Sequence, residues 1–444
     1  MDLQERNALA PVRKGSAVGP GLFSFSCSLR AGLRLRPDEL ERLQLVRLQP
    51  LLEHAYRSVP YYRRLFDSVG FRPHHLRRPS DLQAIPVTTR EQLQKIPKNE
   101  ITTQRIASRL REAHTSGSTG VPLTVYQARR EAWMRKLLTL RAFFQNGLKW
   151  SDRVVTISRH PSTTRGLWFK RFPLLQQWNL CFFEEPEKLL HALLELQPTV
   201  IYGFAANLAI LADLMLKKGI DPLKPRFVAT SSDLLTPGFR RVIAKAFHAD
   251  PLDIYNCTEL GDIACQCERR SGLHINADWL IVELLRGGKQ VLASELGEIV
   301  VTNLFRYAMP MIRYSPGDLA TLTEASCPCG LRLPTLTNLE GRTNSVVPLP
   351  DGRFFKGFST IMGDFLEVDR YQIVQTALDC FLVRIVASRG ACNELPERIA
   401  RIVRERLGPQ VRVECEAVDA IKPLPSGKYQ SVIPLAPVDF GNAP

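Results

Sequence analysis

Long apolar runs are missing from this chain. No stretch approaches the roughly eighteen uninterrupted apolar residues that a membrane-spanning helix needs. Residues 1–36 mix acidic and basic side chains and lack the hydrophobic core that precedes the cleavage site of a secretory signal. These absences predict a cytoplasmic protein without a membrane span. The 444 residues exceed what one ordinary core organises, so two or three domains are expected.

Two common nucleotide-binding signatures are absent as well. The chain has no G-x-x-x-x-G-K-[ST] spacing and no G-x-G-x-x-G, which argues against ordinary P-loop NTPases and Rossmann dehydrogenases. An acidic excess is also missing, because 59 Lys and Arg residues outnumber 44 Asp and Glu residues. The basic residues are dispersed and accompany no zinc finger, helix-turn-helix or RNP motif, so we expect nucleotide phosphates rather than nucleic acid as the anionic partner.

A loop rich in glycine and hydroxyl residues spans residues 114–125. Gly117 and Gly120 permit backbone angles that turn successive N–H groups toward an anion. Hydroxyl donors are added by Thr115, Ser116, Ser118 and Thr119. The composition predicts a triphosphate-binding loop, with a plain Ser/Gly surface linker as the alternative.

Helical and strand patterns alternate through the middle of the chain. Helices are expected over residues 37–70 with a break at 58–62, and over 90–96, 131–145, 187–195, 205–217 and 237–247. Strands are expected over residues 153–158, 200–202, 227–230 and 252–255. Such alternation predicts an α/β fold with a parallel sheet covered by helices and a ligand at the carboxyl ends of the strands.

Polar and aromatic residues follow three of these strands. They are Tyr202-Gly203-Phe204, Ser231-Ser232-Asp233 and Tyr255-Asn256-Cys257-Thr258-Glu259. In a parallel sheet the three strand ends should converge on one crevice. An aromatic can stack on a purine, a threonine hydroxyl can contact a phosphate, and a glutamate can hold a divalent cation. A helix start capped by Thr258 is the alternative for the third segment.

The chain turns β-rich over residues 265–340. Strands are expected at 279–285, 297–302 and 309–314, and a Ser-Pro-Gly turn then leads to Asp318. An aspartate in that place can grip a ribose diol, although a plain turn aspartate is the alternative.

Four residues in this region have the composition of a zinc site. Cys267 and His274 flank a Ser-Gly turn, and Cys327 and Cys329 follow some fifty residues later. Three thiolates and an imidazole complete a tetrahedral Zn²⁺ site with no open position, so we predict a structural metal. Free buried cysteines are the competing interpretation, and Cys265 is an alternative first ligand.

Five segments stand in the order typical of adenylate-forming enzymes. They are residues 114–125, 255–259, 309–318, 341–344 and 426–428. From about residue 40 to 433 the chain resembles the phenylacetate-CoA ligase family and its capsule-biosynthesis-type relatives. The resemblance implies a large N-terminal domain over residues 1–341, with a helical lead-in at 36–100, and a small mobile α+β C-terminal domain over 342–444.

The resemblance also implies roles for individual residues. Residues 116–120 would hold the ATP phosphates, Tyr255 would stack on adenine, and Thr258 and Glu259 would serve the phosphates and Mg²⁺. Asp318 would bind the ribose hydroxyls, and Arg342 would contact ribose or phosphate. Lys428 would be the catalytic lysine, with a solvated surface lysine as the alternative. Ser232, Asp233 and Asn256 are expected beside the nucleotide, and Tyr202, Gly203 and Phe204 along the acyl pocket.

The implied activity is ATP-dependent adenylation of a carboxylic acid, with an aromatic acid as one option, followed by transfer to CoA. The chain departs from the family pattern at residues 341–345 and 349–353, so an amine, a hydroxyl or a carrier-protein thiol stays open as the acceptor. A non-catalytic nucleotide- or nucleic-acid-binding protein on the same fold is the second alternative. The sequence leaves a monomer and an oligomer equally open.

Overall fold

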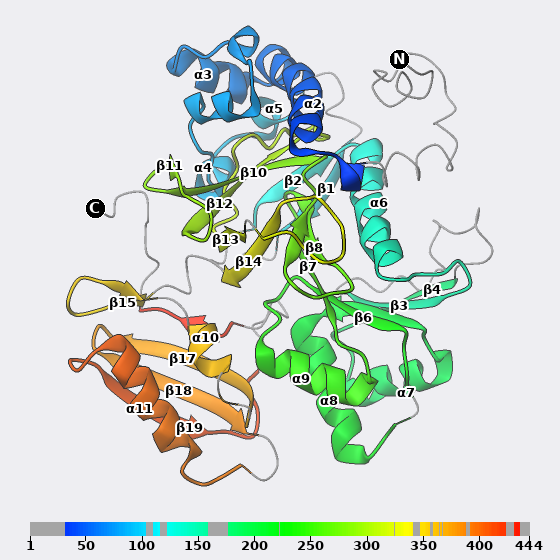
Figure 1. The fold of residues 1–444 in the computed structure, drawn as a ribbon, viewed down its shortest axis with the longest axis vertical. Helices are drawn as coiled ribbons and strands as arrows, with labels where there is room; N and C mark the ends of the chain where they lie inside the picture. The colour runs from blue at the N-terminus through cyan, green and yellow to red at the C-terminus, as the bar shows by residue number, and fades with distance from the viewer. Residues whose placement is uncertain are drawn as a thin grey trace.

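The computed structural model describes residues 32–103, 110–115, 122–158, 176–221, 223–323, 325–340, 347–355, 358–363, 365, 367–387, 391–422 and 430–435. Three parts are visible in Figure 1: a helical N-terminal part, a central sheet with helices, and a smaller C-terminal body. Within the described residues, no helix combines the length and the apolarity that a membrane crossing requires.

The N-terminal part consists of helix α2 (Pro37–Ser58), helix α3 (Pro60–Ser68) and short helical turns. The break falls at Val59, as predicted, because Pro60 starts a new helix and has no N–H to continue the old one. Leu48, Leu52 and Phe66 are fully buried in its core. Tyr62 is buried with them, and its hydroxyl donates to the carbonyl of Pro310 at 2.8 Å, which fastens these helices to the central part.

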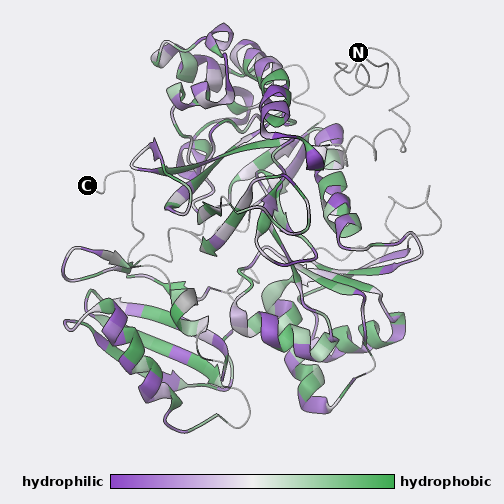
Figure 2. Ribbon diagram, viewed as in Figure 1, coloured by the Kyte–Doolittle hydropathy of each residue, from purple (hydrophilic) through white to green (hydrophobic). Residues whose placement is uncertain are grey.

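The parallel half of the central sheet follows the predicted alternation. Its strands are β4 (Gln176–Cys181), β3 (Arg153–Ser158), β5 (Val200–Phe204), β6 (Phe227–Ser231) and β7 (Leu252–Cys257), in that spatial order. Helices α7 (Pro186–Leu196), α8 (Ala205–Lys218) and α9 (Pro237–Phe247) pack together beside them (Figure 1). The strands are mostly hydrophobic whereas the helices show both colours in Figure 2, which is the pattern of a sheet buried beneath amphipathic helices.

The β-rich segment continues the same sheet and does not form a separate one. Strands β8 (Gly261–Gln266), β9 (Leu273–Ile275), β14 (Thr335–Glu340), β13 (Leu319–Thr323), β12 (Leu296–Asn303), β10 (Leu280–Arg286) and β11 (Lys289–Gln290) extend it to twelve strands. All of these pair antiparallel, starting with β7 against β8. Helix α6 (Arg129–Gln145) packs against β8.

The predicted strand at residues 309–314 is wrong. Only Tyr314 forms β-bridges, to Thr88 and to Val301. Pro310 has no N–H to donate to a ladder, and Arg313 adopts a positive φ of 46°. The N–H groups of Ile312 and Arg313 instead donate to side chains, the Tyr62 hydroxyl at 3.1 Å and Thr302 Oγ1 at 3.0 Å.

Two smaller pairs of strands flank the main sheet. Strands β1 (Arg111–His114) and β2 (Thr124–Gln127) pair antiparallel on either side of the predicted phosphate loop, and helices α4 (Arg90–Gln94) and α5 (Lys98–Ile101) precede them. Strands β15 (Val347–Pro348) and β16 (Phe354–Phe355) are joined by the predicted turn at residues 349–353.

The C-terminal body has its own four-stranded sheet and its own core. The strands β19 (Arg412–Ala417), β18 (Cys380–Ala387), β17 (Val368–Ala377) and β20 (Val432–Ile433) lie in that order, accompanied by α10 (Phe358–Gly363) and α11 (Leu395–Leu407). Ile373, Val383 and Ile399 are fully buried between sheet and helix. This is the α+β composition expected of the C-terminal part.

Helix α9 joins the C-terminal body to the central part. Arg241 donates to the carbonyls of Phe365 and Val368 at 3.1 and 3.0 Å. A Cβ atom on Gly238 would lie 2.5 Å from the carbonyl oxygen of Asp369, so the backbone of α9 touches that of β17 at a place where only glycine fits.

We expect Gly238→Ala to weaken this junction by about 1–3 kcal/mol, because the added methyl group collides with backbone atoms. A helical glycine replaced by alanine would otherwise gain stability. Thermal unfolding and the rate of limited proteolysis measure the effect. Lys245→Ala, on an exposed position of the same helix, is the matched control. Equal stability of the two variants would show that the close contact at Gly238 does not contribute to the stability of the junction.

Candidate functional site

Hydrogen bonds connect the ends of three parallel strands. The hydroxyl of Tyr202 on β5 accepts from Ser231 Oγ at 3.0 Å and from Asn256 Nδ2 at 3.4 Å. Ser232, which follows β6 with a positive φ of 70°, donates to Asn256 Oδ1 at 3.5 Å. The predicted meeting of these strand ends is therefore observed, because neighbouring parallel strands finish at the same edge of the sheet.

A buried carboxylate extends this network into helix α6. Asp262 accepts from Asn256 Nδ2 at 3.1 Å and from the Thr139 hydroxyl at 2.5 Å. Burial raises the pKa of Asp262 and that of Tyr202, since a charge would lose its hydration there.

The other two predicted residues of the acyl pocket follow Tyr202 at the end of β5. Gly203 packs closely against β3, where an added Cβ would lie 3.3 Å from Ile157 Cβ. Phe204 packs edge-to-face on Phe182, with ring centroids 5.0 Å apart. Asp233 follows the β6 end, and its N–H donates to the Ser231 carbonyl at 2.8 Å.

The reversal between β7 and β8 carries Thr258 and Glu259. The chain turns here from one strand directly into the next, so the alternative of a helix capped by Thr258 is wrong. Glu259 is 4% exposed, and its Oε1 accepts from the Tyr314 hydroxyl at 3.0 Å. Arg306 is fully buried and donates to the carbonyl of Glu259 and, at 3.0 Å, to that of Tyr126. Burial lowers the pKa of Arg306 to about 10, which leaves it charged at neutral pH.

Arg90 links this reversal to the glycine-rich loop. Its guanidinium lies 3.9 Å from Glu259 Oε1 and donates to the hydroxyl of Thr115. Thr115 also accepts from the N–H of Leu123 at 2.8 Å, so the two ends of the loop are held together. The rest of the predicted phosphate-binding set, Ser116, Gly117, Ser118, Thr119 and Gly120, lies outside the described residues.

Tyr255 and Asp318 come together from distant parts of the chain. The Tyr255 hydroxyl donates to Asp318 Oδ2 at 2.7 Å. Gly317, with a φ of 82°, makes the turn before Asp318, and its N–H donates to Ser315 Oγ at 3.1 Å. Arg342 and Lys428, the remaining residues assigned to nucleotide and catalysis, lie outside the described residues.

Sequence reasoning missed several charged residues at this site. Arg90, Asp262 and Arg306 belong to no motif that it used. Two of them could have been noticed in the sequence, because Asp262 and Arg306 each interrupt an apolar segment, and the residues around them are buried in the structure. A charged side chain within a buried segment needs a partner, and that partner tends to be functional or structural.

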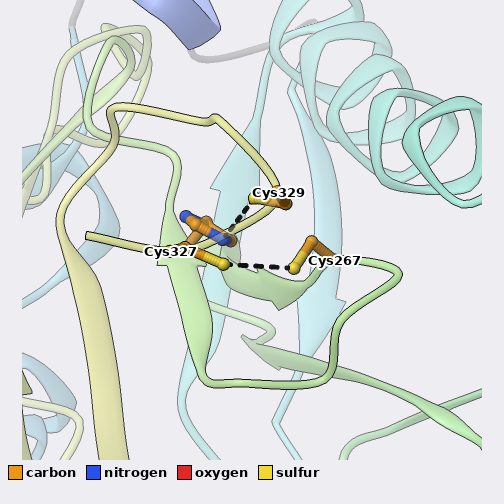
Figure 3. A group of neighbouring side chains, drawn as sticks. Cys267, Cys327 and Cys329 are labelled. Carbon is orange, nitrogen blue, oxygen red and sulfur yellow. Dashed lines mark hydrogen bonds between the residues drawn. The ribbon is translucent and has the colours of Figure 1, made fainter. Parts of the chain in front are cut away.

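The four predicted metal ligands form one cluster. Cys267 follows β8, His274 lies in β9, and Cys327 and Cys329 lie between β13 and β14 (Figure 3). Their ligand atoms all lie within 4.8 Å of one another. Cys267 and Cys327 are 3.6 Å apart at Sγ, and Cys329 Sγ is 3.4 Å from His274 Nε2. Three sulfurs and one imidazole nitrogen at this spacing suit tetrahedral zinc.

Neighbouring groups orient these ligands. The Nδ1 atom of His274 lies 3.3 Å from the Thr335 hydroxyl, an arrangement that leaves Nε2 facing the sulfurs. Gly330 has a φ of 79° and donates its N–H to the Cys327 carbonyl at 3.1 Å, which closes the turn around the two cysteines.

Cys265, the alternative first ligand, is not in the cluster. Its thiol faces Gln145 Oε1 at 3.8 Å, and burial raises its pKa to about 12. In a regular strand, residues 265 and 267 would point to the same face. Strand β8 ends at Gln266, so Cys267 lies beyond the strand and its side chain is free of that alternation. Cys267 is therefore the residue that joins His274.

Comparisons with known proteins agree with this architecture. Residues 354–434 match the family model of the CapK C-terminal domain. Phenylacetate-coenzyme A ligase from Thermus thermophilus is 25% identical over 327 residues, covering 70% of this chain and 72% of the relative. The enzyme of that name from Pseudomonas putida is 28% identical, covering 64% and 67%. Protein CapK from Staphylococcus aureus is 23% identical, covering 80% of each chain.

Solved structures show the same fold. A 2-hydroxyisobutyryl-CoA ligase in its postadenylation state, in complex with 2-HIB-AMP, has a TM-score of 0.79 at 21% identity and covers 91% of each chain. The same ligase in its thioesterification state has a TM-score of 0.64 at 22% identity, again with 91% of each chain covered. The chain is thus a relative of the phenylacetate-coenzyme A ligases and of CapK, with a CapK-type C-terminal domain and the fold of the acyl-CoA ligases.

Proposed function

We propose that the protein is an AMP-forming ligase that activates a carboxylic acid with ATP and passes the acyl group to CoA. One observation carries the proposal: residues of three separate motif segments meet, because Tyr255 donates to Asp318 and Arg90 connects Glu259 to Thr115. The sequence relation to named CoA ligases supports the same conclusion.

Each residue has a defined task in this proposal. Tyr255 holds the adenine, Asp318 the ribose, and the loop at 115–120 the phosphates. Ser232, Asp233, Asn256 and Arg342 complete the nucleotide site, and Tyr202, Gly203 and Phe204 line the acyl pocket. We assign residues 1–341 to the adenylation domain and 342–444 to a mobile C-terminal domain that carries Lys428.

The reaction brings two anions together. A carboxylate oxygen of the acid forms a bond to the α-phosphorus of ATP, and the bond to pyrophosphate breaks. Thr258 donates to the phosphate, and Lys428 places positive charge where the transition state gathers negative charge. Thiol attack by CoA on the acyl carbon then releases AMP.

Glu259 is suited to hold Mg²⁺. Within the described residues its Oε1 is bonded to Tyr314, while no hydrogen bond to Oε2 is found, so one carboxylate oxygen stays available. Mg²⁺ commonly takes only one or two protein carboxylates and completes its shell with phosphate and water. The ion would neutralise phosphate charge during the transfer.

The CapK-type similarity of residues 354–434 supports an amine or hydroxyl acceptor as a second candidate beside CoA. The two candidates are separated by identifying the acyl product that forms when acyl-AMP is offered CoA, an amine or a sugar hydroxyl. Acyl-CoA formation would support the first, and its absence with an active adenylation step the second.

Replacing Lys428 tests the proposed chemistry. Lys428→Ala should lower acid-dependent ATP–pyrophosphate exchange by roughly 100-fold or more, because a charge that stabilises the transition state is lost. Nucleotide binding and the unfolding temperature should change little. Lys422→Ala, at an exposed position nearby in sequence, is the control. Unchanged exchange by Lys428→Ala would remove that lysine from the mechanism.

We further propose that Cys267, His274, Cys327 and Cys329 hold a structural Zn²⁺. The set is closed, so the metal would fasten β8 and β9 to the segment between β13 and β14 and would take no part in acid activation. The cytoplasmic location predicted from the sequence is compatible with reduced cysteines.

Zinc removal should destabilise the fold. Elemental analysis should find about one zinc per chain, and Cys329→Ser should lose it and unfold roughly 5–10 °C lower, as expected when a few kcal/mol of metal binding are lost. Cys392→Ser, which changes an exposed cysteine outside the cluster, should keep both zinc and stability. A metal-free protein that is as stable as the zinc-loaded one would contradict the proposal.

A further inference from the structure

We propose that Arg135 binds a second acidic group on the acyl substrate, so that the protein activates dicarboxylic acids in preference to monocarboxylic ones. The inference rests on the proposed adenylation function and names the substrate class of the same site.

Arg135 extends from helix α6 across the start of β8. A Cβ atom on Gly261 would lie 3.0 Å from Arg135 Cγ and 3.3 Å from its Nε. Gly261 has a φ of 83°, and it follows the segment of Thr258 and Glu259 by two residues. The absence of a side chain at residue 261 therefore lets the guanidinium stem lie directly beside the β7–β8 reversal.

The guanidinium of Arg135 forms no close ion pair in the described part of the chain. No hydrogen bond and no ion pair joins it to a described residue, although the side chain is partly buried. Arg141 on the same helix differs, because it pairs with Asp278 at 2.7 and 3.0 Å. Partial burial of a cation without an ion-pair partner costs hydration free energy, and an anionic ligand would offset that cost.

Asp262 interacts electrostatically with Arg135 but forms no ion pair with it in the described part of the chain. Both oxygens of Asp262 are already bonded, one to Asn256 and the other to Thr139. Arg135 acts electrostatically on Asp262 and also on Tyr202 and Cys257, which places its charge among the ends of β5 and β7. Burial raises the pKa of all three groups, and Tyr202 and Asp262 both accept hydrogen bonds from Asn256, so Arg135 lies beside a polar wall.

That combination suits a particular kind of acid. One carboxylate would react near Thr258, and the other would pair with the planar guanidinium, which can bind a carboxylate through two N–H groups. A neutral methyl group in the same place would leave the cation unpaired. The chemistry therefore favours acids with two carboxylates over monoacids of equal length.

The test compares matched acids in the ATP–pyrophosphate exchange assay. The pairs are succinate with butyrate, glutarate with pentanoate, and terephthalate with benzoate. Wild-type protein should prefer the diacid of at least one pair. Arg135→Gln should lower kcat/KM for that diacid by about 100-fold and change the matched monoacid less than about threefold. Arg129→Gln, on an exposed position of the same helix, should leave both unchanged.

Three results would overturn the proposal: a wild-type preference for monoacids in every pair, an equal loss for mono- and diacids in Arg135→Gln, or no change in that variant. An equal loss would place Arg135 at the reacting carboxylate or the α-phosphate instead. Exchange with none of the acids would count against the adenylation function itself. Calorimetric titration of the diacids then decides separately: binding to wild-type protein but not to Arg135→Gln supports the proposal, and equal binding or none overturns it.

Discussion

The sheet changes from parallel to antiparallel pairing at the reversal between β7 and β8, and the candidate site is built around that place. The reversal puts Thr258 and Glu259 at the edge where the parallel strands end. Its geometry is maintained by Arg306, a fully buried cation whose N–H groups satisfy the Glu259 and Tyr126 carbonyls. Without such a donor these buried carbonyls would be left without hydrogen bonds, which costs about 1–3 kcal/mol each.

Cations surround this reversal from several sides. Arg90 connects it to the glycine-rich loop, Arg306 donates to the Glu259 carbonyl, and Arg135 lies beside Gly261 at the start of β8. An enzyme that joins a carboxylate to a triphosphate has to balance several negative charges in a confined place. Three arginines from distant parts of the sequence thus lie near one reversal, even though basic residues are dispersed along the chain.

The regular parts of the fold could be predicted because their signals are local. Apolar residues recur with helical spacing in α7, α8 and α9, and short apolar runs mark β3, β5, β6 and β7. The segment at 309–314 failed for the opposite reason. Its apolar composition resembles a strand, but Pro310 has no N–H to donate. The N–H of Ile312 donates to the hydroxyl of Tyr62, which lies 250 residues away in the sequence.

The sequence by itself determined the type and chain order of most helices and strands, the motif residues at the strand ends, and a candidate cysteine and histidine set in which Cys265 and Cys267 were alternatives, because each depends on residue type and short-range spacing. Only the tertiary structure decided that the β-rich segment joins the parallel sheet, that Cys267 rather than Cys265 faces His274, and that Arg135 lies over Gly261 without a close ion pair in the described part of the chain. These outcomes depend on which distant side chains share one buried volume, and no local pattern in the chain records that.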